Sequence, residues 1–230
     1  MRLVLFDIDG TLLNSEGLGR TAMRRALGTI FGSPGNPAYR YDGKTDKQIV
    51  RDVMRLEGHT DEHIDSRMDT LIGLYLEGLD DGVKSGKFNV HPHDGVVDLL
   101  DALEAREDVV LGLLTGNVES GARTKLTAAG LDPNRFRVNA FGSDHEHRPE
   151  LPAIAQRRAS EQLGLDIVGE RVVVIGDTPA DIECGRSLGV RAIGVASGHY
   201  TVEQLLEHNP YAAFPSLKDT PQLLETILHA

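Results

Sequence analysis

Four short segments in which every residue is apolar or glycine, many of them β-branched, constrain the fold most strongly. They are residues 3–6, 109–114, 172–175 and 192–195. Such segments have both faces covered, which is typical of parallel strands inside an α/β domain rather than of half-exposed antiparallel strands. A weaker fifth strand is predicted over residues 138–141.

Segments with helical periodicity alternate with the later strands. Between residues 94 and 106, Val96, Leu99, Leu100 and Leu103 recur at the spacing that forms one buried helix face. Further helices are predicted over residues 118–130, 150–164 and 180–189, each of which closes at a glycine. The alternation predicts a doubly wound, Rossmann-like α/β core with one parallel sheet.

One long segment interrupts this alternation. It contains no convincing buried strand, but helical patterns occur near residues 16–30, 46–57 and 60–80. A crossover between parallel strands needs only about a dozen residues, so the segment is interpreted as an inserted α-helical subdomain. The predicted division is a core of residues 1–14 and 91–230 and a helical cap of residues 15–90.

Acidic and hydroxyl side chains directly follow three of the predicted strands. Residues 7–11 read Asp-Ile-Asp-Gly-Thr, residues 115–117 read Thr-Gly-Asn, and residues 177–181 read Asp-Thr-Pro-Ala-Asp. The carboxyl ends of parallel strands meet at one edge of a sheet, so these side chains should lie close together. Clustered carboxylates repel one another and need a cation, and hard oxygen ligands without Cys or His suit Mg²⁺.

The second of these motifs is suited to binding an anion. Thr115 offers a hydroxyl, and Gly116 and Asn117 offer backbone N–H groups where the next predicted helix begins. Such N–H groups bind phosphate well because the helix dipole favours negative charge there. A phosphate oxygen is also a frequent ligand of protein-bound Mg²⁺.

Taken in order, these motifs resemble those of the haloacid dehalogenase-like hydrolase superfamily, in particular phosphoglycolate-phosphatase-like members with a helical cap. The resemblance covers essentially the whole chain. It implies a Mg²⁺-dependent phosphatase that hydrolyses a small phosphorylated metabolite, phosphoglycolate-like or a sugar phosphate, through an aspartyl-phosphate.

The resemblance also implies roles for the acidic residues. Asp7 would be the nucleophile, and Asp9 would be the general acid and then the base that activates water. The metal would be held by Asp7, the backbone carbonyl of Asp9, and Asp177. Neighbouring carboxylates are expected to raise the pKa of Asp9, so that it holds a proton near neutral pH.

Further residues would support this catalytic group. Thr115 would bind a phosphoryl oxygen, Thr11 would support the metal site, and Asp181 would orient a basic residue or a metal-bound water. The family usually has a lysine before proline as the basic residue; here Arg148, before Pro149, is the preferred candidate. Arg157 and Arg158, within the next predicted helix, are the alternatives.

A turn within the predicted cap, Gly43-Lys44-Thr45-Asp46, resembles the substrate-specificity loop of phosphoglycolate-phosphatase-like enzymes. On that interpretation Lys44 and Thr45 bind substrate, with Lys44 facing a distal acidic group. The alternative is an ordinary helix start, in which Thr45 or Asp46 is the N-cap and Lys44 is solvated.

Other functions account for parts of this pattern. Single strand-end residues could be helix caps, and a signalling receiver module also gathers acids, but it is shorter and lacks a cap. Within the family, Asp9 favours phosphate-ester chemistry over dehalogenation or phosphonate cleavage. The remaining alternatives are a phosphosugar mutase of the same family and a non-enzymatic phosphate-sensing module.

Composition limits the partners. The chain has 24 Lys and Arg against 35 Asp and Glu, a formal net charge of −11, which disfavours nucleic acid and anionic membranes. The single cysteine, Cys184, is interpreted as a core residue, and a chain with one cysteine fits a reducing compartment, so a cytoplasmic protein is expected. A monomer or a homodimer is expected.

His59 and His63 have metal-ligand spacing, but no third ligand is near, which disfavours zinc.

Overall fold

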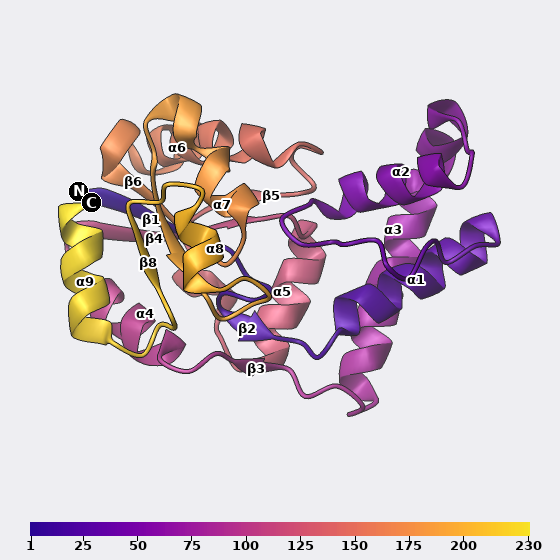
Figure 1. Ribbon diagram of the computed structural model, residues 1–230, viewed down its shortest axis with the longest axis horizontal. Coiled ribbons are helices and arrows are strands. Elements are labelled where there is room, and N and C mark those ends of the chain that lie inside the picture. Colours follow the sequence, from indigo (N-terminus) through magenta and orange to yellow (C-terminus); the bar gives the residue numbers. More distant parts are fainter.

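A six-stranded, all-parallel sheet lies at the centre of the computed structural model, which describes residues 1–230 (Figure 1). The strand order is β5-β4-β1-β6-β7-β8. The strands are β1 (Arg2–Phe6), β4 (Val109–Thr115), β5 (Val138–Phe141), β6 (Val172–Gly176), β7 (Arg191–Val195) and β8 (Ala212–Phe214). The predicted fold class is confirmed, and the five predicted strands are all present.

Both faces of the sheet are covered by helices, as the uninterrupted apolar segments require. Along β1, Val4 and Phe6 pack in one apolar cluster while Leu3 and Leu5 pack in another, because successive strand residues point to opposite faces. The helices α4 (Val96–Glu104), α5 (Glu119–Ala128) and α9 (Thr220–His229) supply the first cluster. The second is supplied largely by α6 (Leu151–Leu163), with Cys184 from α7 (Pro179–Cys184).

A helical insert leaves the core after the first strand and forms a separate body in Figure 1. It consists of α1 (Leu18–Phe31), α2 (Asp46–Leu56) and α3 (Asp61–Lys84). The insert has an apolar cluster of its own, to which the core contributes Val118. Two short antiparallel strands, β2 (Leu13–Asn14) and β3 (His91–Pro92), pair where the chain leaves and re-enters the core.

Some elements differ from the sequence prediction. The helix expected over 180–189 ends at Cys184 and continues as a 3₁₀ turn, Arg186–Leu188. Strand β8, helix α8 (Val202–Leu206) and helix α9 were not predicted; β8 is a three-residue edge strand and only partly buried, so its pattern is weak. None of the helices combines the length and hydropathy needed to cross a membrane.

The topology determines where a ligand can bind. Strand β1 lies between β4 and β6, and the chain runs outward from it in both directions, to β5 on one side and to β8 on the other. In an open α/β sheet, the crevice at the carboxyl ends of the strands around such a switch point is the usual binding site.

Candidate active site

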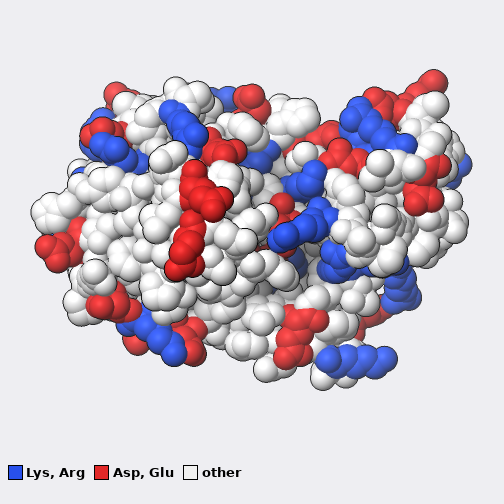
Figure 2. All heavy atoms as spheres, in the orientation of Figure 1, with Lys and Arg blue, Asp and Glu red and all other residues white.

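A cavity of about 820 Å³ lies between this edge of the sheet and the helical insert. The core contributes Asp7, Thr115 and Asp177 to its lining, and the insert contributes Tyr39 and Lys44 among others. Figure 2 shows Lys and Arg side chains gathered at the hollow where the two bodies meet. The cavity thus combines an acidic floor with a basic rim.

Three carboxylates from the core come together on that floor. Asp7, Asp177 and Asp181 are buried, and one oxygen of each lies within 4.8 Å of the others. Burial, followed by the neighbouring acids Asp181 and Asp7, raises the pKa of Asp177 well above its usual value. Burial also raises the pKa of Asp7 to about 6, although Arg148 opposes it. A compact set of hard oxygen donors with suppressed ionisation fits a small divalent cation such as Mg²⁺.

Arg148 lies among these acids and is only 3% exposed. Its Nη2 is 3.1 Å from Asp7 Oδ1, forms an ion pair with Asp181 and donates to the carbonyl of Leu114 at 3.2 Å. Burial disfavours the guanidinium charge, but Asp181 and Asp7 outweigh it and raise the Arg148 pKa. The arginine is therefore a fixed cation beside the expected nucleophile.

The sequence alternatives to Arg148 lie elsewhere. Arg157 is exposed and faces Glu161, and Arg158 forms an ion pair with Asp144 at 2.6 Å. Asp181 also caps α7 together with Thr178, so the residue that orients Arg148 is itself held by the helix start. The hydroxyl of Thr11 donates to Asp177 Oδ1 at 3.0 Å and so supports the acidic group.

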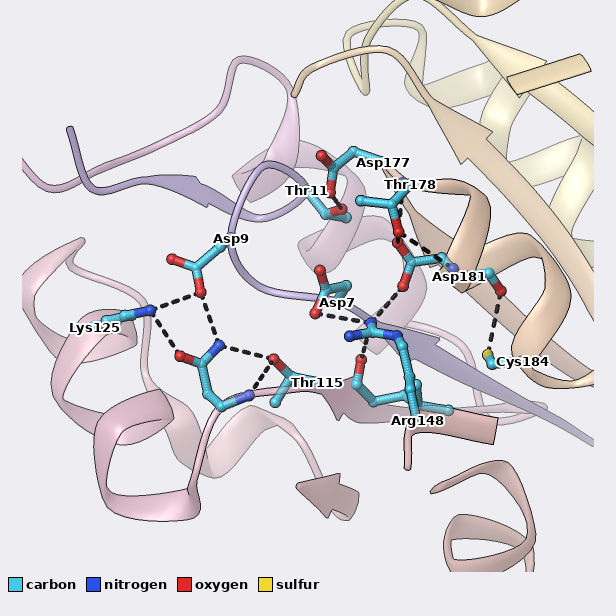
Figure 3. A network of polar contacts seen from close by, with 12 residues as sticks. Asp7, Asp9, Thr11, Thr115, Lys125, Arg148, Asp177, Thr178, Asp181 and Cys184 are labelled. Carbon is cyan, nitrogen blue, oxygen red and sulfur yellow. Dashed lines mark hydrogen bonds and ion pairs between the residues drawn. The ribbon is translucent and has the colours of Figure 1, made fainter. Parts of the chain in front are cut away.

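Asp9 does not belong to the three-carboxylate group. Figure 3 shows its side chain directed toward Lys125 and away from Asp7. Asp9 Oδ2 lies 2.7 Å from Lys125 Nζ and accepts a hydrogen bond from Asn117 Nδ2 at 2.8 Å. Burial acts to raise the Asp9 pKa, but the Lys125 charge and these hydrogen bonds lower it overall. The expectation of a raised pKa at Asp9 is wrong, because Lys125 lies beside it and the third carboxylate of the group is Asp181.

Lys125 is the main residue that sequence reasoning missed. It is 3% exposed, and its ammonium donates at 2.7 Å to both Asp9 Oδ2 and Asn117 Oδ1. A signal existed: the residue stands seven positions after Val118 and three after Ala122, on the predicted buried stripe of its helix. Glycine at position 19 makes the room, since a Cβ there would lie 3.0 Å from Lys125 Nζ.

The loop after β4 contacts the insert through its backbone. Thr115 Oγ1 accepts hydrogen bonds from the backbone and side-chain nitrogens of Asn117. Gly116 approaches Lys44 so closely that a Cβ would lie 2.0 Å from the Lys44 carbonyl oxygen. The Gly116 carbonyl in turn accepts from the backbone N–H of Asp46 at 2.8 Å. Only glycine allows this contact between the core and the insert.

The two residues expected to bind substrate from the insert have other partners. Thr45 is fully buried, caps α2 by accepting from Gln48 N–H, and donates to the carbonyl of Glu146 at 2.6 Å. Its hydroxyl therefore does not face the cavity. Lys44 does line the cavity, but its ammonium is 2.8 Å from Asp52 Oδ2.

The histidines and the cysteine form no further centre. The rings of His59 and His63 stack 5.2 Å apart, and the three aspartates are the only group of three possible metal ligands in the protein. Cys184 is buried, donates to the carbonyl of Asp181 at 3.2 Å, and has a pKa raised by burial to about 12. It is thus a core thiol and not a nucleophile.

The buried Asp7, the three-carboxylate group and the loop after β4 lie together beneath the helical insert, at the sheet edge where α/β folds bind ligands. The sequence model of the family described as haloacid dehalogenase-like hydrolase matches residues 4–195. The chain belongs to this family of hydrolases.

Known relatives extend over most of the chain. The pyrophosphatase PpaX of Bacillus pumilus is 26% identical over 223 residues, which cover 94% of this chain and 93% of that protein. Phosphoglycolate phosphatase 1 of Pseudomonas aeruginosa is 25% identical, covering 95% and 78%. A solved structure of a hydrolase from Pseudomonas syringae superposes with a TM-score of 0.74 at 22% identity and covers 99% of both chains.

Asp46 should give the stability of the protein a measurable pH dependence. Burial raises its pKa from 3.8 to about 6, while its Oδ2 accepts from Val118 N–H at 2.8 Å. Because the folded-state value is the higher one, stability is lost as pH rises through this range. Asp46→Asn keeps an acceptor and should gain roughly 3 kcal/mol over the parent between pH 4 and pH 7.

Urea unfolding in EDTA measures this difference across the pH range. The exposed Asp98→Asn is the control for replacing an aspartate with asparagine. A difference in stability between Asp46→Asn and the parent that does not change with pH would contradict the assignment.

Removing the ammonium at position 125 should raise the pKa of Asp9. In Lys125→Met, burial would act without the opposing charge, so the Asp9 pKa should rise above that of the parent. The readout is the ¹³C titration of the Asp9 carboxyl in metal-free protein. Turnover should fall about 10²-fold, the scale of a misplaced general acid–base group. The exposed Lys84→Met should change neither, and an unshifted Asp9 titration would rule out the role of Lys125.

Proposed function

We propose that the chain is a Mg²⁺-dependent phosphomonoesterase that acts on a small phosphorylated metabolite through a phosphoryl-aspartate at Asp7. The observation that carries the proposal is Asp7 itself, buried at the carboxyl end of β1 beside Arg148 and the acidic residues Asp177 and Asp181. The named activities of the relatives, a pyrophosphatase and a phosphoglycolate phosphatase, support phosphate chemistry.

In the first step, a carboxylate oxygen of Asp7 attacks phosphorus, and the bond from phosphorus to the ester oxygen breaks. The hydroxyl of Thr115, the N–H of Gly116 and Arg148 bind the phosphoryl oxygens, and the Asn117 N–H joins them by exchanging its bond to Thr115 Oγ1 for one to the phosphate. Mg²⁺, held by Asp7, the Asp9 carbonyl and Asp177, would neutralise charge that otherwise repels the nucleophile from its anionic substrate.

Asp9 handles the protons in both steps. Its lowered pKa suits the second step, in which it takes a proton from the water that attacks phosphorus and releases inorganic phosphate. In the first step it must give a proton to the departing oxygen. An incoming phosphate dianion raises the pKa of a neighbouring carboxyl, so substrate binding itself favours protonated Asp9.

Residues 15–90 act as the cap over this chemistry. The loop that carries Lys44 rests on Gly116, and Arg51 of α2 forms an ion pair with Glu146 of the core at 2.6 Å. These contacts close the cavity over a bound substrate, exclude bulk water during transfer, and must break for product to leave.

Replacing the nucleophile is the most direct test. Asp7→Asn should lower kcat by about 10⁴-fold or more, the scale of a lost catalytic nucleophile. Asp98→Asn on the exposed face of α4 is the matched control. Overall retention of configuration at a chiral phosphorus would accompany two successive displacements. Inversion, or near-parental turnover in Asp7→Asn, would exclude the covalent route.

Metal removal tests the acidic group separately. EDTA should abolish phosphate release from an aryl phosphate, and excess Mg²⁺ should restore it. Asp177→Asn should raise the Mg²⁺ concentration needed for half-maximal rate, because it removes one charged ligand. Full activity in EDTA would refute the metal requirement.

Product analysis distinguishes the alternative functions. Isomerised sugar phosphate without free phosphate would identify a mutase, and binding without turnover would identify a phosphate sensor.

A further inference from the structure

The charges around the cavity are not evenly compensated. Five Lys or Arg side chains line it: Arg20, Arg40, Lys44, Lys125 and Arg148. Four of them lie against a carboxylate, and their partners are Asp42, Asp52, Asp9, and Asp7 with Asp181. Arg20 alone has no acidic partner. Arg20 is therefore the one cation of the cavity lining whose charge no carboxylate of the protein offsets.

Neutral groups hold Arg20 in position. Its Nη2 donates to the carbonyl of Tyr39 at 2.9 Å and to that of Pro37, and its guanidinium lies 4.6 Å from the centre of the Tyr41 ring. Burial raises the pKa of both tyrosines, so neither phenol supplies a counter-charge. The remaining nitrogens, Nε and Nη1, make no hydrogen bond within the protein. The guanidinium is therefore oriented without being neutralised.

We propose that Arg20 binds a second anionic oxygen group of the substrate, a carboxylate or a second phosphate, while the scissile phosphate lies at Asp7. The inference rests on the proposed function and narrows its substrate class to phosphate esters that carry another negative group. Arg20 comes from α1 of the insert and Asp7 from the sheet edge, and both line the same cavity. Its volume of about 820 Å³ leaves ample room between them for a metabolite.

Lys44 is the less suitable receptor for this group. An anion that approaches its ammonium must displace Asp52, which is 2.8 Å away and is also bound by the Tyr39 hydroxyl at 2.6 Å. Arg20 has no such competitor, and a guanidinium offers a planar pair of donors that matches a carboxylate or phosphate. The distal anion expected at Lys44 is therefore reassigned to Arg20.

The test compares matched substrates and variants by kcat/KM. 3-Phosphoglycerate is compared with glycerol 3-phosphate, and fructose 1,6-bisphosphate with fructose 6-phosphate, so the two pairs distinguish a carboxylate from a second phosphate. p-Nitrophenyl phosphate reports the chemistry without a second anion. The variant is Arg20→Gln. The control is Arg24→Gln, one turn along α1, whose Nη1 donates to the carbonyl of Gly35 at 3.0 Å outside the cavity lining.

The parent should prefer the doubly anionic member of at least one pair. Arg20→Gln should reduce kcat/KM for that member about 10- to 100-fold, the scale of a charge-assisted hydrogen bond, chiefly through KM. Its rate on p-nitrophenyl phosphate should stay within about twofold. Arg20→Lys should keep part of the preference, and Arg24→Gln all of it.

Two results would overturn the inference alone: no preference in the parent, or an equal loss on all substrates in Arg20→Gln. In both cases, Mg²⁺-dependent hydrolysis of p-nitrophenyl phosphate by the parent leaves the proposed function standing. Failure of the parent to hydrolyse any phosphate ester would overturn both.

Discussion

The mutual repulsion of buried carboxylates is the constraint on which the site depends. Asp7, Asp177 and Asp181 lie within 4.8 Å of one another, and Arg148 contacts two of them. The arginine compensates part of this charge, and a divalent cation would compensate more. The fold brings the group together because β1 and β6 are neighbours, so their strand ends cannot separate without breaking the sheet. The pairing of β1 with β6 that stabilises the core therefore also holds Asp7 close to Asp177.

A second, separate charge balance exists around Asp9. There Lys125 and Asn117 hold the carboxylate apart from the three acids, at the junction with the insert. Asp46 and Tyr75 of the insert lie in the same electrostatic neighbourhood, since each perturbs or is perturbed by Asp9. Asp7 and Asp9, the two carboxylates that the proposed function places in catalysis, thus lie in different environments, and the pKa of Asp7 is raised while that of Asp9 is lowered.

The sheet and the loops that meet at its edge could largely be predicted from the sequence. Uninterrupted apolar segments determine buried parallel strands, and parallel strands determine which loops meet, so Asp7, Thr115 and Asp177 could be placed together without coordinates. Side-chain direction could not be read in this way. The acidic group contains Asp181 where the sequence predicts Asp9, because Lys125 and Asn117 bind the Asp9 carboxylate. The start of α7 holds Asp181 beside Arg148 instead. Lys125 was overlooked because a lysine on a buried stripe has meaning only once its distant partner is known. The Lys44 ammonium binds Asp52, eight positions further along the chain. The Gly-Lys-Thr-Asp motif does not include Asp52, so the motif alone could not predict this ion pair.

The paired strands β2 and β3 have a mechanical consequence. Both chain crossings between the core and the insert run side by side, with Leu13 opposite Pro92 and Asn14 opposite His91 (Figure 1). Because the two crossings pair with each other, the insert is attached to the core at one place and not by two separate linkers. Glu16 and Gly17, directly beyond the ribbon, both have positive φ, of 49° and 80°. These two residues and the ribbon together set the direction in which the chain enters α1, the helix that carries Arg20.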